Sequence, residues 1–172
     1  GTACGARILS LLEAPIEVTD RPDAAPAPAS PRLLAFEQAG YMYPDGTEAL
    51  RGLDASFRRG ELVAVFGRSG SGKSTLAALA TRLFDPTEGR VLLDGVDLRA
   101  FRLASLRERV GLSLQEPVLF GDSIRENLLL GRPDASDEEL RAACTAAAAD
   151  ELVERLPEGL DTILGSAGAG LS

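Results

Sequence analysis

The pattern of apolar and polar positions predicts a first part of the chain that is rich in β-strands. Residues 33–39 have strand character, and residues 53–57 alternate as a strand with one solvent-facing side does. The unbroken apolar run Leu62–Phe66 predicts a strand that is buried on both faces. Residues 90–93 and 110–114 are predicted as further strands.

The helical signals begin after the run Leu62–Phe66 and dominate the last part of the chain. Residues 75–84 are predicted as a helix and residues 103–109 as a short one. Residues 123–130 and 136–149 each open with a serine, a residue type that caps helix N-termini, and a shorter helix is predicted at 151–156. The order of elements predicts an α/β protein, and the sequence has no internal repeat.

Proline and glycine mark the connections. Pro44-Asp45-Gly46 and residues 58–61 have the chemistry of turns, and Asp94-Gly95 is typical of a hairpin. At the N-terminus, residues 2–13 resemble the end of a helix. Residues 14–32 hold half of the prolines, which predicts a stiff, extended linker. The alternative for this segment is a disordered tail.

Composition narrows the range of possible functions. The 172 residues carry a formal net charge of -8, which argues against a surface that grips nucleic acid, because phosphates demand a basic face. Two cysteines cannot make a disulfide framework. The chain has no histidine, which excludes a histidine-based metal site or general base within these residues.

One motif carries specific chemistry. The run Gly67-Arg68-Ser69-Gly70-Ser71-Gly72-Lys73-Ser74 fits G-x-x-x-x-G-K-[ST] and lies between a predicted strand and a predicted helix, as this phosphate-binding motif requires. Its glycines permit backbone angles that turn N–H groups towards phosphate oxygens. Lys73, the only lysine of the chain, would reach the β- and γ-phosphates, and the Ser74 hydroxyl would be a ligand for Mg²⁺. The alternative is a chance glycine-rich turn.

Several further stretches occur in an order and spacing that match one family. They are Phe36–Gly46, Leu50–Leu53, Phe84–Gly89, Leu93–Leu98, Leu114–Pro117 with Leu119-Phe120, Ser123–Leu128 and Leu171-Ser172. With the phosphate loop, they resemble the ATP-binding domain of ABC transporters, above all exporters that carry membrane and ATPase parts on one polypeptide.

The resemblance implies a set of site residues for ATP and Mg²⁺. The implied ATP-binding residues are Tyr43, Gly67, Ser69, Gly70, Ser71, Gly72, Lys73, Ser74, Thr75 and Gln115, with Ser74 and Gln115 as Mg²⁺ ligands. Tyr43 matches the aromatic residue that stacks on adenine, and Leu171 and Ser172 match the start of the signature motif that contacts ATP on a second ATPase domain. The blander alternatives are core packing for Tyr43 and an exposed polar position at a strand end for Gln115.

The resemblance also implies the fold and its segments. The expected fold is α/β of the P-loop NTPase type, an ABC-type ATPase core with an antiparallel β subdomain and the start of an α-helical subdomain. Residues 1–13 would be the cytoplasmic end of a membrane-domain helix and 14–32 a Pro-rich linker. Residues 33–116 would form the ATP-binding core, and 117–172 an incomplete helical subdomain that ends at the signature.

The implied function is that of the ATP-binding part of an exporter, an ATPase that couples ATP binding and hydrolysis to transport at the cytoplasmic face of the cell membrane. The implied partners are a second ABC ATPase domain and the membrane domain of the same polypeptide, with no nucleic acid. The family's catalytic Glu follows the signature, so no catalytic residue is expected among these residues. The ATPase activity is expected of the intact protein, and this part alone is expected to be inactive. The alternatives are a non-transport ABC-type ATPase, a small-molecule P-loop kinase, or a truncated piece that only binds nucleotide or only contacts a partner.

Overall fold

The computed structural model describes residues 12, 14, 16–113 and 119–165, and the chain divides into two units. In the described part of the first unit, residues 1–112, four strands form one antiparallel sheet in the order β2-β1-β3-β4. The bounds are β1 Leu33–Met42, β2 Glu48–Arg58, β3 Glu88–Leu93 and β4 Val96–Asp97. The predicted strands at 33–39, 53–57 and 90–93 are thus confirmed.

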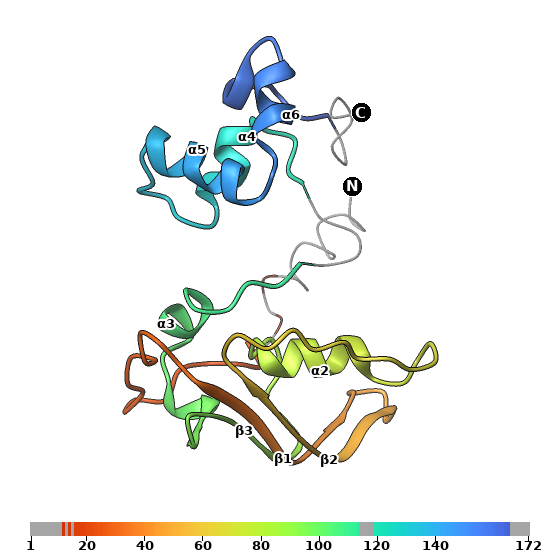
Figure 1. The fold of residues 1–172 in the computed structure, drawn as a ribbon. Helices are drawn as coiled ribbons and strands as arrows, with labels where there is room; N and C mark the ends of the chain where they lie inside the picture. Colours follow the sequence, from red (N-terminus) through yellow and green to blue (C-terminus); the bar gives the residue numbers. More distant parts are fainter. Residues whose placement is uncertain (1–11, 13, 15, 114–118, 166–172) are drawn as a thin grey trace. The chain divides into compact units, whose positions relative to one another are not determined.

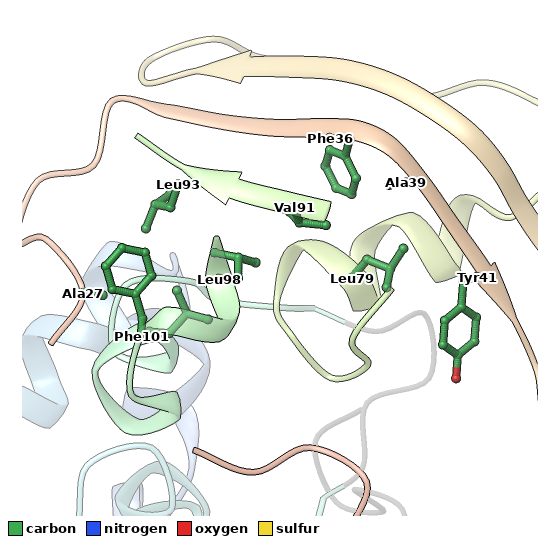
Figure 2. Close-up of a cluster of buried hydrophobic side chains, with 10 residues drawn as sticks. Ala27, Phe36, Ala39, Tyr41, Leu79, Val91, Leu93, Leu98 and Phe101 are labelled. Carbon is green, nitrogen blue, oxygen red and sulfur yellow. The ribbon is translucent and has the colours of Figure 1, made fainter. Parts of the chain in front are cut away.

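Helical elements cover one face of this sheet. They are α2 Lys73–Ala80, the 3₁₀ turn η1 Leu98–Ala100 and α3 Leu103–Arg107. Figure 1 shows α2 lying along the sheet, and Figure 2 shows Leu79 of α2 pointing at the strand that carries Phe36 and Ala39. Both Leu79 and Phe36 are buried, so the core of this unit lies between α2 and β1.

The predicted hairpin and turns are confirmed. Leu93 pairs with Val96 across Asp94 and Gly95, whose φ angles are +50° and +82°, as a two-residue hairpin of this type requires. The Asp94 carboxylate also accepts the backbone N–H groups of Arg32 and Leu33 at 2.9 Å, which fixes the start of β1.

Two predicted strands are wrong. Leu62–Phe66 has no strand structure, and Phe66 is 90% exposed where burial on both faces was expected. Residues 110–113 are not a strand either, and residue 114 lies outside the described part. An apolar run is buried only where neighbouring strands flank it, and no described residue forms a strand ladder with either segment. The predicted helix 75–84 also ends early, at Ala80.

The second unit is helical. It contains α4 Ile124–Leu129, α5 Asp137–Ala146, α6 Asp150–Arg155 and the 3₁₀ turn η2 Gly159–Asp161. The predicted helices at 123–130 and 136–149 are confirmed with shorter bounds, and the one at 151–156 is confirmed one residue earlier. Its core is made by residues from each element, namely Ile124, Leu140, Cys144, Val153, Leu160 and Leu164. Ser123 and Ser136 cap α4 and α5, as their place in the sequence predicted.

Within the first unit, residues 16–32 contact the segment that contains η1 and α3. Ala24 and Ala27 are buried, and the Ala25 N–H donates to the Ala100 carbonyl at 2.9 Å. The predicted helix end at 2–13 lies outside the described residues, apart from Leu12. Among the residues that are described, no helix has the length and apolar character that crossing a membrane requires.

Candidate functional site: the phosphate loop

The N-terminus of α2 is open. Its N-cap is Gly72, with φ +83°, and no side chain of the described residues caps the first turn. The first turn also carries no acidic residue. The first N–H groups of a helix have no partner within the helix, and the helix dipole makes this end positive. Such an end is suited to an anion such as a phosphate group.

A Cβ on either of two glycines of the loop would come very close to other atoms. A Cβ on Gly72 would lie 2.4 Å from the carbonyl oxygen of Ala49, and a Cβ on Gly67 would lie 2.5 Å from the Ser71 Oγ. Gly72 also has a positive φ, which side chains rarely adopt. A side chain at position 72 would therefore displace the loop from β2, whereas at position 67 a rotation of the Ser71 hydroxyl could relieve the contact.

Lys73 lies over the loop. Its Nζ donates hydrogen bonds to the carbonyls of Gly67 at 2.9 Å and Arg68 at 2.8 Å, and it lies 3.4 Å from the Ser71 Oγ. The ammonium is therefore held beside the backbone of the glycine-rich turn. Rotation of the lysine side chain alone can turn it from these carbonyls towards an anionic oxygen.

Tyr43 adjoins the same helix turn. Its hydroxyl lies 3.0 Å from the Thr75 Oγ1, and its ring packs edge-to-face on Tyr41 with 5.0 Å between centroids. Tyr41 in turn stacks on Phe84 at 5.0 Å. Burial raises the pKa of the Tyr41 hydroxyl, so this ring stays uncharged at neutral pH. The cluster holds an aromatic side chain beside the start of α2.

The structure brings most of the predicted ATP site together. Tyr43 lies beside the predicted loop residues, which continue into α2 at Lys73, Ser74 and Thr75. Gln115, Leu171 and Ser172 lie outside the described residues.

Two residues that shape the loop were not predicted from the sequence. Ala49 and Leu50 meet the position of a Cβ on Gly72 at 2.4 and 2.7 Å. Nothing in the sequence signals this contact, because it depends on how β2 passes the loop.

These observations indicate that the residues present fit the phosphate groups of a nucleoside triphosphate. The tight glycine positions, the open helix end and the ammonium all favour an anion at one place. Tyr43 beside them is partly buried and packs against the core of the first unit, as the core-packing alternative for this residue expected.

Comparison with known proteins agrees with this geometry. Residues 50–172 match the family described as ABC transporter. The ATP-dependent lipid A-core flippase of Chromohalobacter salexigens is 43% identical over 100% of this chain and 30% of its own length. The cyclolysin secretion/processing ATP-binding protein CyaB of Bordetella pertussis is 46% identical over 87% of this chain and 21% of its own length. The chain thus spans less than a third of these curated relatives.

A solved structure shares the fold. The structure of a bacterial Atm1-family ABC exporter with ATP bound superposes with a TM-score of 0.85 and 38% sequence identity, covering 99% of this chain and 30% of that one. This match confirms the expected P-loop NTPase fold with its antiparallel sheet and added helices. The chain belongs to the ABC transporter family, and its fold is that of the family's ATP-binding part.

Proposed function

We propose that this chain is the ATP-binding part of an ABC exporter, which couples ATP binding and hydrolysis to the transport of a substrate across a membrane. The observation that carries the proposal is the open N-terminus of α2, over which Lys73 bridges the carbonyls of Gly67 and Arg68. The names of the relatives support transport, since they include a flippase and a secretion protein.

In this proposal, backbone N–H groups of the loop and of the first turn of α2 bind the phosphate oxygens. Lys73 compensates the charge of the β- and γ-phosphates, and Tyr43 offers its ring to the adenine base. The other loop residues, Ser69, Gly70 and Ser71, shape the turn, and Thr75 fixes Tyr43 through the contact between their side-chain oxygens.

Ser74 and Gln115 are the proposed ligands of Mg²⁺, through a hydroxyl and an amide oxygen. Both are hard oxygen ligands, which Mg²⁺ prefers. The ion, when bound, would neutralise charge on the phosphates. We assign no catalytic role to any residue of this chain.

The proposal extends to partners and place. Leu171 and Ser172 would contact ATP held by a second ABC ATPase domain, identical or not. A membrane domain of the same polypeptide would hold the ATP-binding part at the cytoplasmic face of the membrane. Residues 14–32 would be the linker between these two parts. The matched relatives are about three times longer than this chain or more, which leaves room for a membrane domain in a protein of their size.

The test is equilibrium binding of Mg-ATP to the chain, measured by calorimetry, with Lys73→Ala and Arg90→Ala compared. Arg90 is an exposed cation paired with Glu37 at 2.7 Å, away from the loop, so it controls for loss of positive charge. We expect Lys73→Ala to weaken binding by on the order of 100-fold, about 2.7 kcal/mol, and Arg90→Ala to leave it unchanged. Equal affinity in the unsubstituted chain and Lys73→Ala would contradict the proposal.

A further inference from the structure

The C-terminal end of α2 carries an unusual residue. Arg82 follows the C-cap Thr81 with φ +50°, its N–H donates to the Leu79 carbonyl at 3.1 Å, and the Leu83 N–H donates to the Ala78 carbonyl at 2.8 Å. This is the Schellman pattern, in which the left-handed position is usually glycine. A non-glycine residue held there points to a role for its side chain.

The Arg82 side chain joins three segments. It is 2% exposed, and its guanidinium donates at 3.0 Å to each of three acceptors. Nε donates to the Asp85 carboxylate, Nη1 to the Phe101 carbonyl and Nη2 to the Thr19 carbonyl. The planar guanidinium serves these three acceptors from three different nitrogen atoms, an arrangement that the single ammonium nitrogen of a lysine cannot reproduce.

The segment that Arg82 reaches is docked along its length. The Ala27 N–H donates to the Ser105 Oγ at 2.8 Å, and the Asp20 carboxylate accepts the Leu103 N–H at 2.7 Å. Backbone bonds between Ala25 and the residues that flank Phe101 extend the contact. Ala27 lies in the core near Phe101 (Figure 2). Residues 16–27 are therefore packed onto the unit that holds the phosphate loop.

We propose that Arg82 is a positioning residue that couples the N-terminal segment to the state of the phosphate loop through α2. This inference rests on the proposed function, in which that segment links the ATP-binding part to a membrane domain. One helix of eight residues, about 12 Å long, carries Lys73 at its start, and the arginine directly follows its C-cap. The helix has no glycine or proline, so it moves as one body.

A coupling between two sites through α2 must be reciprocal. If ATP at the start of α2 strengthens docking of residues 16–27, docking must strengthen ATP binding by the same factor. The factor we expect is about fivefold, at the lower end of measured couplings. A purely structural clamp would hold the segment equally well with and without ATP.

The experiment measures backbone amide exchange of the full chain with and without Mg-ATP, together with ATP affinity. The reporter amides are Ala25, Ala27 and Arg102, which make the docking hydrogen bonds. Amides of the β1–β2 ladder report whether the fold is retained. In the unsubstituted chain, we expect protection of the reporters to rise about fivefold on adding ATP while ladder amides stay unchanged.

Two variants disrupt the docking of residues 16–27, one by a change at Arg82 and the other by a change within the segment. Arg82→Gly removes the side chain, and glycine suits the left-handed backbone at this position. Ala27→Asp places a charge in the core from within residues 16–27 and leaves Arg82 unchanged. We expect each to undock residues 16–27, so that the reporter amides lose their protection, and to lower ATP affinity by the full coupling factor of about fivefold. The matched control is Ala148→Gly, at the equivalent Schellman position of α5 with φ +53°, which should change neither.

The outcomes separate the two proposals. Reporter protection that does not respond to ATP, or an Ala27→Asp chain that loses protection but binds ATP normally, overturns the coupling and leaves the proposed function standing. Absence of ATP binding in the unsubstituted chain, with protected reporters, overturns the proposed function and the coupling with it.

Discussion

Helices α2 and α5 begin in opposite ways. At α5, the Ser136 hydroxyl accepts the Glu139 N–H and the Glu139 carboxylate accepts the Ser136 N–H, and three acidic residues occupy the first turn. At α2, the N-cap is a glycine, and the first turn has neither a side-chain cap nor an acidic residue. When side chains cap the first N–H groups of a helix and acidic residues compensate its dipole, an external anion gains little by binding there. The start of α2 has neither the side-chain cap nor the acidic residues, as a phosphate site requires.

The largest effect on stability and ATP affinity should come from adding a side chain at Gly72, the N-cap of α2. Gly72→Ala brings a Cβ within 2.4 Å of the Ala49 carbonyl at a positive φ. We expect a loss of stability of about 2–3 kcal/mol and of ATP affinity on the order of 100-fold, measured by denaturant unfolding and calorimetry.

Gly46→Ala provides the matched control for Gly72→Ala. Gly46 has φ +86°, and nothing lies within 4 Å of the position that a Cβ would take, so the substitution meets backbone strain without a clash. We expect it to cost about 1 kcal/mol and to leave ATP affinity unchanged. Equal effects of the two substitutions on ATP affinity would contradict the role assigned to the close approach of Gly72.

A smaller effect is expected from removing the cap of α5. Ser136→Ala breaks the capping box and should destabilise the helical unit by about 1 kcal/mol, seen as faster amide exchange in α5. ATP affinity should not change, because this helix start is not assigned to the nucleotide. Weaker ATP binding in Ser136→Ala would show that the two helix starts are not functionally distinct.

The smallest effect is a pH dependence of the helical unit. The hydrogen bond from the Ser136 N–H lowers the pKa of Glu139, and the Arg125 guanidinium lowers the pKa of Asp161. Carboxylates with a lowered pKa stabilise the fold above their unfolded pKa of about 4 and lose this contribution as the pH falls through the folded value. The effect is small because these groups are exposed.

This pH dependence is measured as α5 amide exchange at pH 7 and pH 3, after correction for the intrinsic exchange rate. Glu139→Gln should reduce the difference between the two pH values, because a glutamine does not titrate. The phosphate loop, residues 67–75, contains no carboxylate, so the same substitution should leave its exchange unchanged. An unaltered pH difference in Glu139→Gln would contradict the assigned cause.

Local chemistry explains what could be predicted from the sequence. The capping serines and the Asp94-Gly95 hairpin depend on residues adjacent in the chain, and the structure places both as expected. The phosphate loop leads into α2 as expected, but the predicted strand before it is absent. The exposed Leu62–Phe66 could not be predicted, because burial of a strand depends on its neighbours. The helix end at Ala80 was missed for a similar reason. The partners of Arg82 include Thr19 and Phe101, which are distant in sequence.

The most direct test of the central claim is the backbone amide response to Mg-ATP, followed residue by residue by NMR in the full chain. We predict large shifts for the amides of Gly70, Gly72, Lys73 and Ser74 at the start of α2, and none for Ser136–Glu139 at the start of α5. Shifts of similar size at both helix starts, or none at the start of α2 under saturating Mg-ATP, would contradict the claim.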